Sequence, residues 1–370
     1  MGTRRGDAAL SFDRLIEQHQ AKQLLLAALR DGPSHAYLLH GPAGVGKHVA
    51  AIGFAAELLG DGDRVERGAH PDLYVLEPHG EMIRIDDVRE LRRDLHMRPF
   101  EADRRVYVIA DAHLLNAEAA DALLKDLEEP PPYAIVVLVA DELGPIPETI
   151  RSRCQLVPFQ RLSERAVRAE AERLAPALSP EELTAVARVA AGRLDRVARL
   201  LDEDSSRRRG EVLALARSVY TDPSFDPAAA AQAVTALAGE RGAAARARAE
   251  EALATRDLPD RESEQHVRRA ERGAERDEIL LALEELTAWY RDLVVFAAGA
   301  ERTVVHYDRL AVLAEDATPE RMLGAERAAE VVRGTWRTFE EFNVTPALAL
   351  EAMFVRLQRQ LAVAAPVPAG

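Results

Sequence analysis

Residues 41–48 have the residue types and spacing of a phosphate-binding loop. They read Gly-Pro-Ala-Gly-Val-Gly-Lys-His, follow the apolar segment Tyr37–Leu39 and precede the helical pattern Val49–Leu59. Glycines let a backbone wrap closely around an anion, a helix N-terminus directs its amides at the anion, and Lys47 can reach the outer phosphate oxygens. The glycines concerned are Gly41, Gly44 and Gly46. We therefore prefer a phosphate-cradling loop to an incidental glycine-rich turn.

The metal-binding position of this loop is missing. The residue after the lysine should be Ser or Thr, whose hydroxyl ligates Mg²⁺, and here it is His48. Neutral imidazole is a poor ligand for a hard cation that prefers oxygen. We therefore expect the protein to require no cofactor, and we assign no metal ligands to this loop. Weak binding of ATP or ADP by the loop stays open.

A second part of a nucleotide-hydrolysing site is also missing. The apolar run Arg105–Ala110 should end in an Asp that organises Mg²⁺, followed by a Glu that activates water. The sequence has Ala110 at the first position and the shorter Asp111 at the second. We interpret Asp111 and His113 as a polar strand end that caps the next helix; the alternative is a rebuilt metal site.

An α/β domain must position these residues. Between positions 36 and 159, short apolar runs alternate with longer amphipathic stretches, which is typical of a parallel sheet covered by helices. Strands are expected at Ala36–His40, Asp72–Leu76, Arg105–Ala110, Ile135–Ala140 and Gln155–Phe159, and helices at Val49–Leu59, Ile85–Leu95 and Ala117–Leu127. The prolines at 130–132 end the last of these helices, because proline cannot continue a helix.

The rest of the chain is predicted to be helical. Short helices are expected at Leu162–Leu174, Pro180–Ala191 and Leu194–Asp202, with Ser163 and Ser179 as N-caps. Longer, alanine-rich helices are expected to follow, with a break at Thr221–Pro227.

This pattern predicts three domains. They are an α/β domain at 8–160, a small helical domain at 161–205 and an all-helical C-terminal domain at 206–365. Within the C-terminal domain, residues 240–278 hold many arginines and acids but few large apolar residues. We expect this segment to be a solvated helix or a mobile arm with i,i+4 ion pairs.

Composition narrows the class of protein. Sixty-two acidic residues against 48 basic ones give a net charge of −14, whereas a protein that holds DNA by its own phosphate contacts is usually basic. No apolar run approaches the ~18 residues of a membrane span, and no apolar region of a signal peptide follows the N-terminus. The single cysteine, Cys154, excludes a cysteine-based zinc cluster. We expect a cytoplasmic protein without membrane contact or zinc.

Several motifs in a fixed order resemble the AAA+ subunits of bacterial DNA polymerase III clamp loaders. The resemblance is strong over about residues 10–200. It implies an AAA+ module, a lid and a collar through which subunits pack into a ring. The motifs are His35–Leu39, Gly41–Lys47, Ile83–Asp86, Leu123–Pro131 and Ile150–Gln155.

The departures from that family indicate a subunit that has lost its own ATPase. At four positions, motor subunits carry a metal ligand or a phosphate-sensing residue, and this chain has another residue at each. Motor subunits also carry a four-cysteine zinc module in the segment that corresponds to Glu57–Pro71, which contains no cysteine here. The four positions are His48, Ala110, Asp141 and Asp195, the last followed by Arg196. The resemblance then implies the stator role, with gamma or tau motor subunits and the delta subunit as partners. It implies contact with the sliding clamp and primed DNA through the complex.

One motif of the family that acts on a neighbouring subunit is retained. Ser152-Arg153-Cys154 resembles the motif whose arginine enters the adjacent ATP site, where a guanidinium spreads positive charge over the γ-phosphate oxygens. The resemblance assigns this catalytic role in trans to Arg153. Alone, the tripeptide would be an ordinary surface arginine, and Cys154 is expected to be a packing residue.

Two other functions remain open from the sequence. The first is an ATP-hydrolysing gamma- or tau-like motor subunit whose metal site is rebuilt from Asp111 and His113. The second is a DNA-binding AAA+ module of another system, against which the negative net charge argues.

Overall fold

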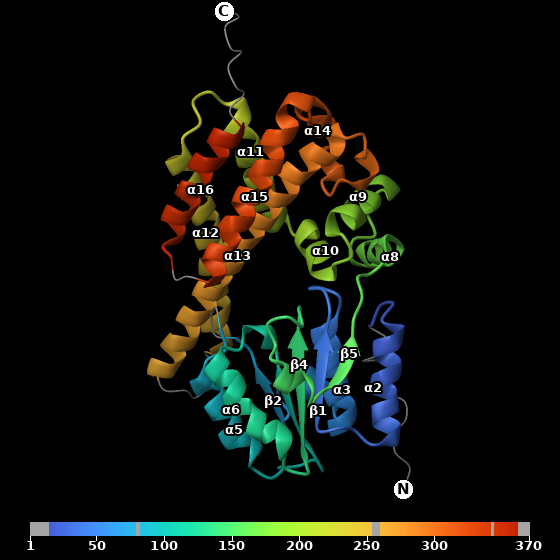
Figure 1. Ribbon diagram of the computed structural model, residues 1–370. Helices are drawn as coiled ribbons and strands as arrows, with labels where there is room; N and C mark the ends of the chain where they lie inside the picture. Colours follow the sequence, from blue (N-terminus) through green and yellow to red (C-terminus); the bar gives the residue numbers. More distant parts are fainter. Residues whose placement is uncertain (1–14, 79–81, 254–259, 342–343, 362–370) are drawn as a thin grey trace, which may run out of the picture. The chain divides into compact units, whose positions relative to one another are not determined.

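The computed structural model of the 370-residue chain describes residues 15–78, 82–253, 260–341 and 344–361 (Figure 1). The described residues divide into two compact units. Unit 1 runs to Glu170 and also includes Gly192–Arg196; unit 2 comprises Ala171–Ala191 and the described residues from Val197 onward. The ends of the predicted domains, at 8 and 365, lie outside the described residues. The predicted lid, 161–205, has residues in both units, and the three-domain division stays a prediction.

Unit 1 is built on a five-stranded parallel sheet with the order β2-β3-β4-β1-β5. In the register of the central strands, Leu38 of β1 lies opposite Leu138 of β4 and Leu156 of β5. The strands are β1 (Ala36–His40), β2 (Leu73–Leu76), β3 (Arg105–Ile109), β4 (Ala134–Ala140) and β5 (Gln155–Pro158). The parallel α/β class and all five strand positions predicted from the sequence are confirmed.

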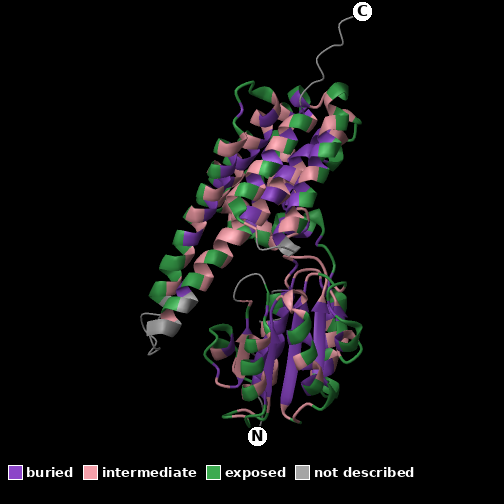
Figure 2. Ribbon diagram, turned by 60° about the vertical axis from the view of Figure 1, so that its left-hand side comes forward, coloured by how far each residue is buried: buried purple, intermediate pink, exposed green. Residues whose placement is uncertain are grey.

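Helices cover both faces of this sheet, which is why its strands are mostly apolar. Side chains such as Tyr37 and Val137 pack with α2, α3 and α4 on one face, whereas Leu38 and Val136 pack with α5, α6 and α7 on the other. The central strands β1, β3 and β4 are almost wholly buried (Figure 2). The helices of unit 1 are α2 (His19–Asp31), α3 (Lys47–Leu59), α4 (Gly62–Glu66), α5 (Ile85–Leu95), α6 (Ala117–Glu128) and α7 (Glu148–Arg151), with the short helix η1 (Ala112–Leu114).

Side-chain caps begin several helices at the predicted places. Ser163 Oγ accepts from the Ala166 amide at the start of α8 (Glu164–Leu174), and Ser179 forms a capping box with Glu182 at the start of α9 (Pro180–Ala190). Both predicted N-caps are confirmed. Each satisfies a backbone donor that has no partner within the helix.

Unit 2 is helical throughout its described residues, around one large core. The core includes Trp289 and Tyr290, whose polar atoms bond to Tyr220 Oη and the Ala216 carbonyl. None of the described helices is both long and apolar enough to cross a membrane. Besides α9, the helices from residue 194 onward are α10 (Leu194–Leu201), α11 (Glu203–Thr221), α12 (Pro227–Leu253), α13 (Asp260–Ala297), η2 (Glu301–Thr303), η3 (Tyr307–Arg309), α14 (Leu310–Asp316), α15 (Pro319–Glu341) and α16 (Pro346–Leu361).

The charged segment 240–278 falls on α12 and α13, with residues 254–259 outside the described part. These two helices lie side by side (Figure 1). Arg246 pairs with Glu250 four residues on (2.9 Å) and with Glu271 across the pair of helices (3.4 Å). Exposed pairs of this kind contribute only a few tenths of a kcal/mol each, so packing nearer the core must hold the helices together.

A buried charged network joins α13 to the segment that precedes α14. His306 is fully buried, and its ring nitrogens lie 2.9 Å from Asp292 Oδ2 and 3.0 Å from Glu285 Oε2. Arg209 of α11 also pairs with Glu285 (3.0 Å). Burial alone would lower the pKa of His306, but the hydrogen bonds to Asp292 and Glu285 raise it above its ordinary value.

This network predicts a pH-dependent stability of unit 2. Because the folded pKa of His306 is raised, its stabilising effect is complete below the unfolded pKa of about 6.5 and is lost as pH rises through the folded pKa. We expect His306→Ala to lower the free energy of unfolding by about 3 kcal/mol near pH 6 and by less at pH 9. Urea titrations followed by tryptophan fluorescence check this, since Trp289 and Trp336 both lie in unit 2.

The control variant is His48→Ala, because His48 is exposed in the other unit. It should leave the same transition unchanged at both pH values. A deficit of His306→Ala that is equal at pH 6 and pH 9 would contradict a charged His306.

Candidate functional site

The predicted phosphate loop connects β1 to α3 and depends on glycine at three positions. Gly41, Gly44 and Gly46 have φ values of 144°, 69° and 96°, which residues with a side chain rarely adopt. A Cβ at position 41 would lie 2.3 Å from the carbonyl oxygen of Phe159, where the chain leaves β5. The local strand–loop–helix arrangement that the motif predicts is therefore present.

The lysine of the loop is turned toward its own chain. Lys47 is only 4% exposed, donates to the carbonyl oxygens of Gly41 (2.7 Å) and Pro42, and pairs with Asp141 Oδ1 (2.7 Å). An ammonium group has three N–H donors, and three oxygens of the chain satisfy them. A phosphate that enters this loop would have to displace at least one of these partners.

A carboxylate lies against the middle of the loop. A Cβ at position 44 would be 1.6 Å from Asp195 Oδ1, and the Leu194 amide donates to the Gly44 carbonyl (2.8 Å). Arg193 binds the Asp195 carboxylate through Nε (3.2 Å) and Nη2 (2.7 Å). Burial would raise the pKa of Asp195, but the hydrogen bond and charge of Arg193 hold it below its ordinary value. Asp195 is thus an anion at the place where the loop would receive one.

The positions that should supply metal ligands in a motor subunit offer none of the required oxygens. His48 is exposed in the first turn of α3, and the buried Ala110 directly follows β3. Burial and then the charge of Lys47 lower the pKa of the neighbouring His40, which therefore adds no positive charge near neutral pH.

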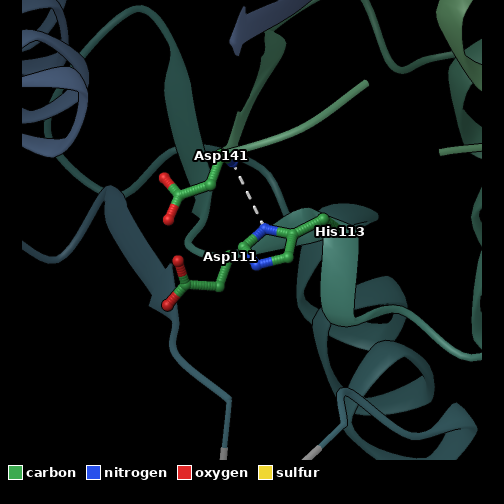
Figure 3. Close-up of side chains that lie close together, drawn as sticks. All are labelled: Asp111, His113 and Asp141. Carbon is green, nitrogen blue, oxygen red and sulfur yellow. Dashed lines mark hydrogen bonds between the residues drawn. The ribbon is translucent and has the colours of Figure 1, made fainter. Parts of the chain in front are cut away.

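Three other polar side chains meet beside the loop. Asp111, His113 and Asp141 each offer a ligand atom, and these atoms lie within 4.8 Å of one another (Figure 3). His113 Nδ1 accepts a long hydrogen bond from the Asp141 amide (3.4 Å). Two carboxylates and one imidazole are a donor set that suits a transition metal better than Mg²⁺.

The sequence interpretation of Asp111 was wrong in one respect. Asp111 is at the N-cap of η1, but its side chain makes no capping hydrogen bond, and Asn116 caps the following helix α6 instead. Asp141 was noted only as a lost sensor residue. Its proximity could have been inferred, because β3 and β4 are neighbouring parallel strands whose carboxyl ends meet at one edge of the sheet.

The motif Ser152-Arg153-Cys154 lies at the opposite edge of the same sheet. It precedes β5, which runs parallel to β1, whereas the loop follows β1. Gln155 is level with Tyr37, so the length of the strands separates Arg153 from the loop of its own chain. The structure does not bring the predicted site residues together in one place.

The environment of Cys154 indicates packing and not reactivity. The side chain packs against the core on the α6 face of the sheet, and burial raises the pKa of its thiol to about 12. Because the thiolate is the nucleophile, Cys154 is unreactive near neutral pH.

Comparison with known proteins finds similarity over most of unit 1. Residues 16–163 match the family model described as "DNA polymerase III, delta subunit". The chain is 34% identical over 173 residues to DNA polymerase III subunit delta-prime of Bacillus subtilis, covering 43% of this chain and 53% of that protein. Residues 16–163 are thus similar to the delta-prime subunits of DNA polymerase III. The delta-prime subunit of Pseudomonas aeruginosa is 38% identical over 136 residues, 33% of this chain and 42% of that protein.

A subunit named tau is nearly as similar. DNA polymerase III subunit tau of Bacillus subtilis is 33% identical over 168 residues, 42% of this chain and 30% of that protein. The chain spans about half or less of the length of these curated relatives. Sequence identity alone therefore does not distinguish a delta-prime subunit from a tau subunit. The residues at the loop are needed for that distinction.

The contact between Asp195 and the loop predicts unequal effects of two alanine substitutions. Gly44→Ala and Gly46→Ala both strain a positive φ, but a Cβ at position 46 would meet nothing closer than Leu15 Cδ2 at 3.6 Å. We expect Gly44→Ala to destabilise α3 by about 1 kcal/mol more than Gly46→Ala, the low end of the range for overpacking, because the half-exposed Asp195 side chain can turn away from the new Cβ. Amide hydrogen exchange of α3 measures this.

Asp195→Ala in the Gly44→Ala background provides the control, because it removes the carboxylate that the new Cβ would meet. The double variant should exchange like Gly46→Ala. Equal exchange in the two single variants would show that Asp195 does not press on the loop.

Proposed function

We propose that this chain is a non-hydrolysing, delta-prime-like AAA+ subunit of a DNA polymerase III clamp loader. In this role it acts in the cytoplasm, helps to load the sliding clamp onto primed DNA, and needs neither zinc nor a nucleotide of its own. Its partners are gamma or tau motor subunits and the delta subunit. The clamp and the DNA are reached through the complex, which agrees with the net charge of −14.

The observation that carries this proposal is that the loop keeps its glycine-dependent conformation while groups of the same chain bind its lysine and lie against it. Lys47 is bound by the Gly41 and Pro42 carbonyls and by Asp141, and Asp195 lies over Gly44. A nucleotide would bring phosphate charge next to the Asp195 carboxylate, and like charges at contact repel. We favour a stator subunit over a motor subunit because of these contacts and because His48 and Ala110 stand at the positions of the metal ligands.

The position of Arg153 supports a role toward a neighbouring subunit. Arg153 precedes β5 at the sheet edge away from its own loop, and its side chain is one-third exposed. A guanidinium at a subunit boundary can stabilise the charge that develops on a neighbour's γ-phosphate. We therefore propose that Arg153 is the arginine finger that this subunit donates in trans.

A second candidate function is favoured by the cluster of Asp111, His113 and Asp141. If these residues hold a divalent cation beside Lys47, the chain is a motor subunit with a rebuilt metal site. Against this candidate, Asp141 already pairs with Lys47, and Asp195 covers the loop that the nucleotide would need.

The first candidate predicts negligible ATP hydrolysis by the pure chain. Loss of the metal ligands removes several kcal/mol of transition-state stabilisation, so the rate should equal that of Lys47→Ala. A phosphate-release assay with Mg²⁺ and with Mn²⁺ measures it. Turnover that is lost in both Lys47→Ala and Asp111→Asn would establish the second candidate instead.

The trans role predicts that Arg153→Ala leaves the chain folded and able to assemble, because substitutions of exposed residues usually change stability by less than ~0.5 kcal/mol. Clamp- and DNA-stimulated hydrolysis by the rebuilt complex should fall. The loss at the served site is about 10³–10⁵-fold and is smaller in the total, since the other sites keep their own arginines.

Arg153→Lys should restore little of this hydrolysis, because an ammonium lacks the planar fork that pairs with phosphate oxygens. Clamp loading and steady-state hydrolysis are the measurements, with assembly checked by size-exclusion chromatography. Wild-type values for the alanine variant would mean that Arg153 is a surface residue only.

A further inference from the structure

Arg153 is held by an acid of its own chain. Its Nη2 forms an ion pair with Glu128 Oε1, and its Nη1 donates to the Thr149 carbonyl (2.7 Å) and to Ser152 Oγ (3.5 Å). A guanidinium carries five N–H donors in a fixed plane, and here both terminal nitrogens are engaged. A phosphate that approaches either terminal nitrogen must therefore compete with an acceptor of the same chain.

Glu128 lies at the end of its helix where an acid is electrostatically unfavourable. It is the last residue of α6, where the unsatisfied carbonyls carry partial negative charge and a cation is preferred. Lys125, one turn earlier, meets that preference. Arg153 follows Glu128 by 25 positions in the sequence. The fold brings these two side chains together, because the end of α6 lies near the start of β5.

Resting on the proposed trans role of Arg153, we propose that Glu128 is a positioning residue that holds the arginine in cis until a neighbouring γ-phosphate displaces it. The carboxylate and the phosphate compete for the same Nη2 edge, so Arg153 must leave Glu128 in order to act. The Thr149 carbonyl keeps hold of Nη1 and limits how far the side chain moves. Glu128 thereby suppresses hydrolysis at a neighbouring site that is not yet correctly placed.

The strength of the pair suits an exchange of this kind. Both side chains are partly exposed, Arg153 33% and Glu128 49%, and exposed ion pairs shift an equilibrium by up to about fivefold. A multiply charged phosphate in a closed subunit interface binds a guanidinium more strongly than one exposed carboxylate does. The pair therefore lowers the population of free arginine without preventing its transfer.

The cis pair can be tested on the isolated full-length chain. Phenylglyoxal modifies free guanidinium groups, and peptide mass spectrometry gives the rate at Arg153. We expect Glu128→Gln to raise this rate about two- to fivefold. The matched control is Glu129→Gln, which removes the neighbouring exposed carboxylate at the C-cap of α6 and should leave the rate unchanged. Equal rates in wild type and Glu128→Gln would overturn the proposal.

The function of the pair is tested in the rebuilt clamp-loader complex. Glu128→Gln should raise hydrolysis in the absence of clamp and DNA by about two- to fivefold and leave the stimulated maximum unchanged, so that the ratio of the two rates falls. In the Arg153→Ala background, Glu128→Gln should change neither rate. A structural role of Glu128 would lower both rates in both backgrounds, which would also overturn the proposal.

These measurements separate the two proposals. If Arg153→Ala leaves hydrolysis by the complex unchanged, the trans role is wrong and the role of Glu128 falls with it. If Arg153→Ala lowers hydrolysis but Glu128→Gln leaves the ratio of unstimulated to stimulated rates unchanged, the trans role stands and only the role of Glu128 is wrong.

Discussion

The buried ammonium of Lys47 is the constraint on which the arrangement around the loop depends. A buried charge without partners is very unfavourable. Here the carbonyls of Gly41 and Pro42 and the carboxylate of Asp141 bind the ammonium. Those partners hold the loop in the conformation that its glycines allow. Asp195 then lies against the loop, at a glycine whose missing side chain leaves room for it. The site is complete electrostatically without a ligand.

The parallel sheet separates the two candidate sites of unit 1. Residues that follow β1, β3 and β4 meet at one edge, where the loop and the Asp111–His113–Asp141 cluster lie. Residues that precede β5 lie at the other edge, where Arg153 meets Glu128. A subunit of this design cannot use its own arginine on its own loop. Under the proposed function it offers the arginine to a neighbour, while Asp141 and Asp195 occupy its own loop.

Most of the fold of unit 1 could be predicted from the sequence. Strands buried on both faces are continuous apolar runs, so that β1 was predicted at its observed bounds and the other strands within one residue at each end. Helix starts were equally clear where a serine caps them, as at Ser179, because the capping interaction is local. The division into two units could not be predicted, since Gly192–Arg196 joins unit 1 through contacts with residues near positions 44 and 162.

The sequence by itself determined which chemical groups are absent: His48 and Ala110 cannot supply the oxygens that Mg²⁺ needs, and this holds in any conformation. It also determined the phosphate loop, because strand, glycines, lysine and helix are consecutive. Only the tertiary structure decided which groups of the chain lie against the loop. Asp195 is about 150 residues from Gly44 in the chain, and Glu128 is 25 from Arg153. Long-range pairs of this kind leave no periodic or local signal, since they form only when separate elements pack together.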